Sequence, residues 1–248
     1  MSRIFTAAAL IIGNEILSGR TRDANVAYLG RRLNELGVRL VEVRILPDLE
    51  EAVVPALRAL KESNDYVFTT GGIGPTHDDI TVDCVAKALG RKVVEHPEAR
   101  RILEDHYDEA INEARLRMAR APEGAELLEN PISAAPGLHI ENVFVLAGIP
   151  EIMRAQFESA APLIHGGQPL QSVSLPVAMA ESVIAPGLGA LQERYPDVEM
   201  GSYPYQRAGR FGTVLVLRSP EGARLAAAAA ELRQLIAELG GRIEEETS

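Results

Sequence analysis

Residues 65–81, DYVFTTGGIGPTHDDIT, decide the fold of this chain. Residues 66–68 are β-formers without a polar interruption, which suits a strand covered on both faces. Three glycines then allow positive φ angles and the close approach of a ligand: Gly71, Gly72 and Gly74. Apolar residues recur at helical spacing after the loop, and Gly90 ends the predicted helix. A strand, a glycine-rich loop and a helix in this order point backbone N–H groups at one spot, which predicts an anion site of the phosphate type.

Two carboxylates, Asp78 and Asp79, complicate a simple phosphate site. We expect one of them to cap the following helix, because Asp is a preferred N-cap residue. The other adds negative charge beside an anion site, and a divalent cation (Mg²⁺ or similar) between carboxylate and phosphate oxygens would relieve the repulsion. His77, in the same loop, is a candidate to touch a ligand phosphate. The loop lacks the lysine and the spacing of a Walker P-loop, so its glycines alone are weak evidence.

The composition favours a soluble, cytoplasmic α/β protein. A chain of 248 residues allows one large or two modest domains. The formal charge of −10 argues against non-specific binding to nucleic acid or anionic membranes, and the absence of Trp removes a stacking platform for single strands. We expect no signal peptide and no membrane span, because no apolar run is long enough. Cys84 is the single cysteine and lies in an apolar helical run, so we expect a buried structural thiol.

Polar residues follow two further predicted strands. Residues 4–12 are a near-continuous apolar run. Three residues come directly after it: Gly13, Asn14 and Glu15. Residues 38–46 read as the second strand and close at a Pro-Asp pair that places Asp48 at the strand's end. Because ligands bind at the carboxyl edge of an open parallel sheet, we expect these polar groups near the glycine-rich loop.

The rest of the first domain alternates helices and strands. Asp23 is expected to cap a helix that runs to residue 36. Residues 97–120 predict one long charged helix, and residues 121–139, which lack a helical period, predict an extended loop held by proline turns. Residues 142–147 predict a strand, and a second Gly/Pro turn at 148–150 should lie beside the first on the same sheet edge.

A change in composition at residues 165–169, His-Gly-Gly-Gln-Pro, predicts a boundary between two domains, 1–167 and 168–248. Beyond it the pattern predicts a strand, a helix, two strands and a helix, and this βαββα order suggests a small two-layer α+β domain. Residues 203–210 are expected to form a polar turn between the two consecutive strands. A solvated hairpin tip is favoured there over a ligand clamp.

The segments GGIGPTHDDIT, residues 71–81, and GNEIL, residues 13–17, resemble the MoaB/MogA-like molybdopterin-binding domain, in the version found at the N-terminus of CinA-type proteins. The resemblance implies an α/β fold with a three-layer, mostly parallel sheet, followed by a second, smaller α+β domain. It also implies a homo-oligomer, a dimer or a trimer. Three positions depart from the family pattern: Ser133 stands where relatives usually carry Gly, and Ala147 and Ile152 replace the Pro and Glu of a Pro-Gly-x-Pro-x-Glu motif.

The same resemblance assigns roles to residues. In MogA-like proteins a Pro-Asp carboxylate faces the Asp of the glycine-rich loop, which makes Asp48 and Asp79 the catalytic candidates. With Asp78 they would also hold the divalent metal. The ligand-binding candidates are Gly13, Asn14, Glu15, Asp23, Asn25, Gly71, Gly72, Gly74, Pro75, Thr76, Pro136, Gly137, Gly148 and Pro150.

Three functions stay open at this point. In the first, a metal-activated water hydrolyses the pyrophosphate of a bound nucleotide, because CinA-like relatives are associated with ADP-ribose pyrophosphatase activity. In the second, the pocket binds or adenylates a molybdopterin-like pterin phosphate. In the third, the chain is a dimerisation or regulatory module whose pocket has decayed. The expected partner is a small phosphorylated molecule, with no nucleic acid and no membrane.

Overall fold

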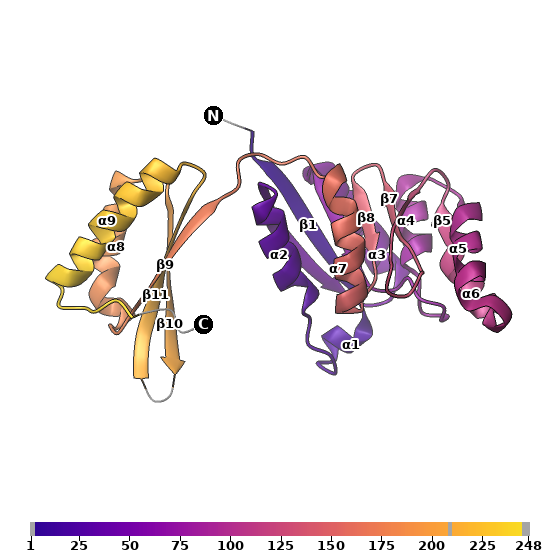
Figure 1. Cartoon of the computed structure of the whole chain (residues 1–248), viewed down its shortest axis with the longest axis horizontal. Coiled ribbons are helices and arrows are strands. Elements are labelled where there is room, and N and C mark those ends of the chain that lie inside the picture. The colour runs from indigo at the N-terminus through magenta and orange to yellow at the C-terminus, as the bar shows by residue number, and fades with distance from the viewer. Residues whose placement is uncertain (1–2, 208–209, 245–248) are drawn as a thin grey trace. The chain divides into compact units, whose positions relative to one another are not determined.

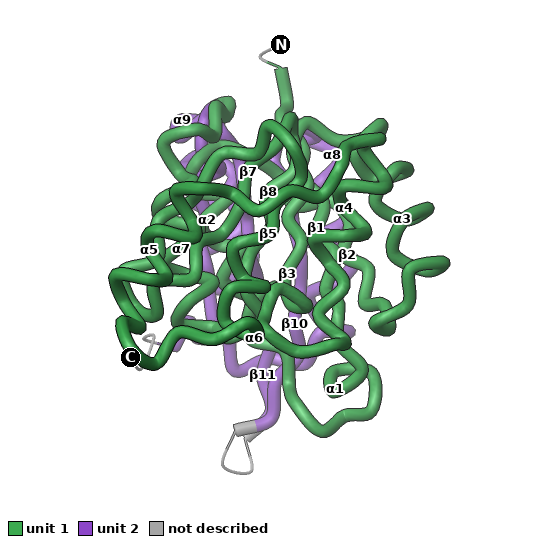
Figure 2. Tube along the Cα trace, turned by 90° about the vertical axis from the view of Figure 1, so that its right-hand side faces the viewer, with its two compact units in different colours: residues 1–167 green, residues 168–248 purple. Residues whose placement is uncertain are grey.

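The computed structural model describes residues 3–207 and 210–244, and the chain divides into two compact units, residues 1–167 and 168–248 (Figure 2). The first unit is built around one six-stranded sheet, and the second has its own three-stranded antiparallel sheet. The predicted fold class is therefore confirmed. In the described part of the chain, no helix is long and apolar enough to cross a membrane.

The sheet of the first unit has the strand order β2-β1-β3-β8-β7-β6. Four strands are parallel: β1 (Phe5–Ile12), β2 (Val38–Leu46), β3 (Tyr66–Thr70) and β8 (Val143–Leu146). Two more pair antiparallel at one edge: β7 (Gly137–Ile140) and β6 (Glu126–Leu128). Because β1, β3 and β8 are neighbours, the loops after their carboxyl ends meet at one edge of the sheet (Figure 1).

Helices cover both faces of this sheet, which makes three layers (Figure 1). The even-numbered residues of β1 from Ala8 to Ile12 share a core with α3 (Glu50–Ser63) and α4 (Thr81–Leu89). The odd-numbered residues from Ala7 to Ile11 share another with α2 (Asn25–Glu35) and α7 (Pro150–Ala160). These six side chains are at most 2% exposed. Burial on both faces is why β1 reads as a continuous apolar run.

One predicted helix is wrong, because residues 97–120 do not form a single element. Helix α5 (Pro97–Tyr107) ends where Asp108 adopts a φ of 45°. The chain continues as three short turns: η1 (Asp108–Ala110), α6 (Glu113–Leu116) and η2 (Arg117–Ala119). The break has a local cause, since the side-chain oxygen of Asn112 accepts the N–H of Arg115 at 2.9 Å and so caps a new helix.

The predicted extended loop over residues 121–139 is wrong in part. β5 (Arg120–Pro122) pairs antiparallel with β4 (Val93–Glu95), and β6 pairs with β7. Strands of three or four residues are too short to show a period. Only residues 129–136 remain without regular structure between β6 and β7.

The second unit has the predicted βαββα order. Its elements are β9 (Gln171–Val177), α8 (Glu181–Arg194), β10 (Glu199–Arg207), β11 (Arg210–Ser219) and α9 (Gly222–Glu238). β11 lies between β10 and β9, and one core joins the sheet to both helices. The two consecutive strands pair antiparallel as expected for a hairpin, but the turn predicted over residues 203–210 is too long, because β10 continues to Arg207 and its Tyr203 pairs with Val214. Residues 208–209 of that prediction lie outside the described residues.

Candidate functional site

The glycine-rich loop leaves β3 through a gap that only glycine fits. Gly71 has a φ of +96°, and a Cβ at this position would lie 2.2 Å from the carbonyl oxygen of Ile12. The Gly71 N–H donates to the carbonyl oxygen of Leu146, at the end of β8, at 3.1 Å. A Cβ on Gly148 would lie 3.3 Å from the Cα of Gly71. The two Gly/Pro turns are therefore neighbours at one sheet edge, and this prediction is confirmed.

Thr81 ties the loop to the start of α4. Its buried hydroxyl donates to the carbonyl oxygen of Gly71 at 2.7 Å, and its N–H donates to the carbonyl oxygen of Gly72 at 3.0 Å. Gly72 has a φ of +67°, and a Cβ there would lie 2.4 Å from the Thr81 hydroxyl oxygen. The loop is thus held in one conformation by a residue ten positions after its first glycine.

Three consecutive backbone N–H groups in this loop are free to bind an anion. The N–H groups of Gly72, Ile73 and Gly74 donate to no other residue within the described ranges. Helix α4 begins further along the chain, at Thr81, and the dipole at its N-terminus favours negative charge. Free N–H groups in a positive-φ loop before a helix are the physical requirement for a phosphate site.

The two loop carboxylates do not cap α4, so that expectation is wrong. The N-cap is Ile80, and no side chain caps the helix. Instead, Asp79 Oδ2 accepts hydrogen bonds from the N–H and the hydroxyl of Thr76, at 2.7 and 2.6 Å. Asp78 Oδ1 lies 2.5 Å from the same hydroxyl, and this hydrogen bond is the main reason why the pKa of Asp78 is below its usual value. Both carboxylates therefore bind Thr76 and fix the conformation of the loop. Asp79 Oδ1 has no protein partner among the residues that the structure describes.

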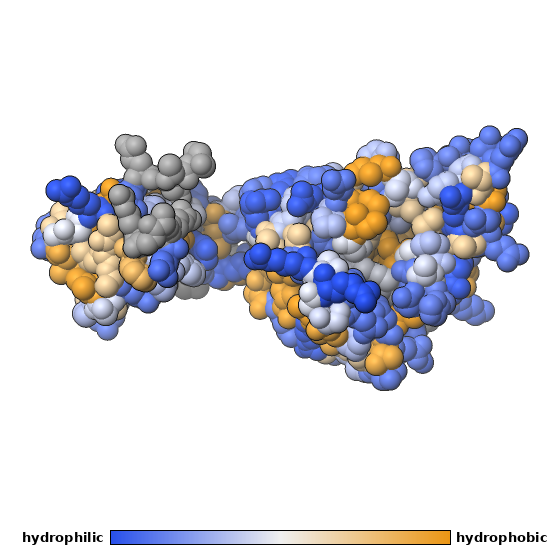
Figure 3. Space-filling model, turned by 90° about the horizontal axis from the view of Figure 1, so that it is seen from below, coloured by the Kyte–Doolittle hydropathy of each residue, from blue (hydrophilic) through white to orange (hydrophobic). Residues whose placement is uncertain are grey.

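A cavity of about 660 Å³ lies against this loop. Nine of the predicted site residues line it: Glu15, Gly71, Gly72, Gly74, Pro75, Thr76, Asp79, Gly148 and Pro150. Its volume lies in the range of small-molecule sites. Figure 3, seen from the side on which α1 (Asn14–Leu17) lies, shows hydrophobic and hydrophilic residues around a hollow in the first unit. The structure thus brings Glu15, Asp79 and the three residues with free N–H groups to one cavity.

A second, smaller cavity of about 60 Å³ shares four lining residues with the main one: Glu15, Thr21, Gly148 and Pro150. Asp23, Asn25 and Thr70 also line it. Asn25 is 3% exposed, and its side-chain N–H donates to the carbonyl oxygen of Gly148 at 2.9 Å. The N-cap of α2 is Ala24 and not Asp23, the residue expected from the sequence, but Asp23 still accepts the N–H of Val26, in the first turn of α2, at 2.9 Å.

A comparison with known protein families shows to which family this chain belongs. Residues 8–166 match a family described as "Probable molybdopterin binding domain". The chain belongs to this molybdopterin-binding family. Residues 169–240, in the second unit, match a family described as "FAD synthase, middle domain".

Individual proteins are also similar to this chain. A protein of Aeropyrum pernix is 38% identical over 96% of both chains, and one of Archaeoglobus fulgidus is 34% identical over 78% of this chain and 83% of its own. The crystal structure of CinA from Thermoplasma acidophilum, a protein described as of unknown function, is 32% identical with a TM-score of 0.61. It covers 64% of this chain and 97% of that one. The resemblance to CinA-type proteins is therefore confirmed.

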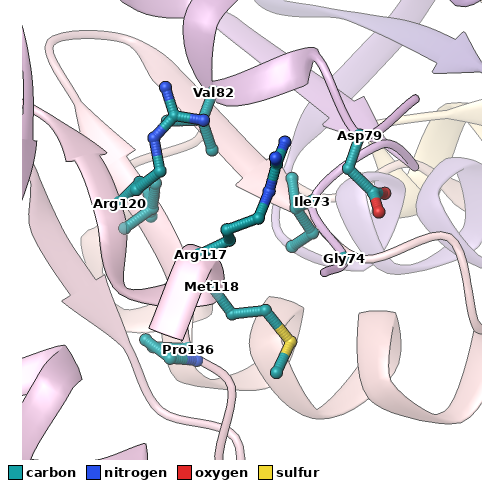
Figure 4. A pocket seen from close by; sticks show the side chains of 9 residues that line it. Ile73, Gly74, Asp79, Val82, Arg117, Met118, Arg120 and Pro136 are labelled. Carbon is teal, nitrogen blue, oxygen red and sulfur yellow. The ribbon is translucent and has the colours of Figure 1, made fainter. Parts of the chain in front are cut away.

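Other predicted residues of the molybdopterin-binding pattern lie outside the main cavity. Asp48 accepts the N–H of Asn14 at 2.9 Å, where it joins the ends of β1 and β2. Gly13, Asp78 and His77 are not among the residues that line either cavity. Pro136 lines a third hollow of about 20 Å³ beside the loop (Figure 4). Gly137 lies in β7, where a Cβ would lie 3.0 Å from the carbonyl oxygen of Val145.

The departures from the family pattern change the wall of the main cavity. Ser133, Ala147 and Ile152 all line it. Where the family motif has a glutamate, Ile152 presents an apolar side chain, so this part of the wall has one carboxylate fewer. Within the described residues, no group of three or more His, Cys, Asp or Glu side chains is arranged to hold a metal.

One wall of the cavity was missed by the sequence analysis. Tyr107, Arg115 and Met118 line it, all from the region predicted as one long helix. The Arg115 guanidinium lies 4.3 Å from the centre of the Tyr107 ring and donates to the carbonyl oxygen of Ala110. Figure 4 shows Arg117, from the next turn, extending toward Ile73 in the adjoining hollow, which Asp79 also lines. Asn112 could have indicated the break in the predicted helix, because Asn is a residue type favoured at helix N-caps.

Proposed function

We propose that this chain binds a phosphorylated nucleotide in the main cavity and hydrolyses a pyrophosphate bond in it, with ADP-ribose as the model substrate. The observation that carries the proposal is that two acidic residues and three residues with free N–H groups line one cavity of about 660 Å³. The N–H groups would bind the phosphate. The carboxylates would act at the reacting phosphorus, either directly or through a divalent cation.

The acidic residues fit a cation that arrives with its phosphate. Mg²⁺ is usually bound through one or two carboxylates plus substrate phosphates, and rarely by an all-protein cage. Glu15 and Asp79 line the cavity, and Asp79 Oδ1 is free because Thr76 occupies only Oδ2. A bound cation would supply charge neutralisation and a water of lowered pKa. Thr76 orients Asp79, and Asp79 would take the proton of the attacking water or hold the cation.

Asp48 takes a different part in the proposal. Its carboxylate accepts the Asn14 N–H at 2.9 Å and does not line the cavity. Asp48 therefore positions the segment that carries Glu15, one residue after Asn14. We propose Glu15, rather than Asp48, as the partner of Asp79 in the pair of carboxylates that acts on the phosphate.

Two observations bear on the class of ligand. The second unit matches the middle domain of FAD synthase, which favours a nucleotide such as ADP-ribose or FAD. The name of the family that matches the first unit favours a pterin phosphate instead, bound or adenylated at the same loop. The cavity walls suit a flat ring of either kind, since Ile73, Met118 and Ile149 lie among its lining residues.

The test is AMP release from ADP-ribose and from FAD by the purified chain, with and without added Mg²⁺ or Mn²⁺. We expect metal-dependent AMP release that Asp79→Asn abolishes. Asparagine keeps an oxygen for the two Thr76 hydrogen bonds, so the loop stays folded. No AMP release with either metal, together with binding of a pterin phosphate, would transfer the assignment to the pterin function.

A further inference from the structure

The smaller cavity contains two buried polar atoms without a partner. Asn25 Oδ1 and Thr70 Oγ1 make no hydrogen bond within the described part of the chain, although the two residues are only 3% and 1% exposed. Both residues line the cavity of about 60 Å³ beside the main site. Buried polar atoms are nearly always paired, so two orphaned atoms on one cavity require an explanation.

The orientation of the Asn25 amide is fixed by its neighbour. Its Nδ2 donates to the carbonyl oxygen of Gly148 at 2.9 Å, so the opposite assignment would set two acceptors against each other. Oδ1 is therefore a buried hydrogen-bond acceptor that a donor on a ligand could satisfy. Thr70 is the last residue of β3, immediately before the glycine-rich loop, so its hydroxyl lies where the phosphate-binding segment begins.

We propose that this cavity is a subsite for an amino-bearing edge of the ligand's planar heterocycle, as on adenine or a pterin. The amino group donates to Asn25 Oδ1 and, with its second hydrogen, to the Thr70 hydroxyl. Four residues line both cavities, so a ligand whose phosphate sits at the loop can place its ring edge here. The inference rests on the proposed binding of a nucleotide or pterin in the main cavity.

The cavity is also large enough for ordered water, which is the simplest other occupant. The two occupants, water and an amino group of the ligand, predict different ligand preferences. If the amino group donates directly to Asn25 Oδ1, replacing it by a carbonyl places two acceptors against each other and lowers the affinity. If only water fills the cavity, amino and carbonyl ligands bind equally.

The experiment compares AMP with IMP, and pterin with lumazine, by calorimetry on the full chain. We expect AMP and pterin to bind about tenfold more tightly than their carbonyl counterparts. Thr70→Val should raise the Kd of AMP and of pterin about threefold, because it removes the acceptor of the second amino hydrogen and keeps the shape of the side chain. Equal affinity of the two members of each pair for the wild type overturns the proposal, as does an unchanged Kd of AMP and pterin in Thr70→Val.

Thr69→Val is the control. Its hydroxyl is also buried without a partner, but the side chain points to the opposite face of β3 and does not line either cavity. Both variants should raise the melting temperature of the free protein, because each removes an unpaired buried hydroxyl. Only Thr70→Val should change the affinity for AMP and pterin. Tight binding without any preference contradicts the subsite alone, whereas no binding of all four ligands contradicts the proposed function as well.

Discussion

The hydroxyl of Thr81 donates to the carbonyl oxygen of Gly71 at 2.7 Å, and this buried bond joins the first residue of α4 to the first residue of the glycine-rich loop. The bond sets the loop's shape before any ligand arrives. A phosphate site made of backbone N–H groups depends on that shape, because the donors cannot be moved independently of the chain.

Thr81→Val should destabilise the fold by about 1–3 kcal/mol, because it leaves the Gly71 carbonyl buried without a donor. Urea denaturation followed by circular dichroism measures the change. Thr81→Ser keeps the hydroxyl and should lose much less stability. Equal losses in the two variants would show that the methyl group, and not the hydrogen bond, is what matters.

Gly71→Ala should be among the most damaging single changes in the chain. The Cβ would lie 2.2 Å from the Ile12 carbonyl oxygen, and the residue would have to keep a φ of +96°. We therefore expect the free energy of unfolding to fall by about 3 kcal/mol or more, and ligand binding to be lost. Gly90→Ala is the matched control. Its φ is +66°, but no atom lies within 4 Å of the added Cβ, so only about 1–2 kcal/mol of backbone strain is expected. Thermal melting of both variants tests this order.

The sequence was most informative where structure is local. The strand, loop and helix at residues 65–90 follow from short patterns of apolar residues and glycines, and the structure has them in that order. The prediction failed where a local competitor interrupts a good helical pattern. Asp108 and Asn112 divide residues 97–120, and the wall with Tyr107 and Arg115 was missed for that reason.

Long-range contacts at the site could not be inferred from spacing. Asn25 reaches the Gly148 carbonyl across 123 positions, and nothing near either residue indicates the other. Asp79 looked like a helix cap because Asp favours that position, yet Thr76 offers it two donors and holds it in the loop. Which carboxylates share a cavity depends on such contacts, and this is why Glu15 rather than Asp48 accompanies Asp79 there.

Cys84 should make the protein less stable at high pH. Burial, more than the nearby Glu50 and Asp83, raises the pKa of its thiol to about 11 from the usual 9.0. The unfolded chain therefore loses this proton first, and the free energy of unfolding should fall as pH rises from about 9 to 11, by up to about 1.4 kcal/mol per pH unit. Comparing urea unfolding of the wild type and Cys84→Ala at pH 8 and 10.5 isolates this contribution. Parallel pH dependences in the two proteins would contradict it.

Arg115→Gln should weaken the binding of phosphorylated ligands. The guanidinium lines the main cavity, rests on the Tyr107 ring at 4.3 Å and has no carboxylate partner within the described residues, so its charge is free to meet a phosphate. We expect the Kd of ADP-ribose to rise about tenfold. This corresponds to the loss of part of a charge-assisted hydrogen bond, which contributes about 1.5–3 kcal/mol. Arg101→Gln is the control, since it removes the same charge from α5, where Arg101 pairs with Glu98 and Asp105. A similar rise in both variants would show that only net charge matters.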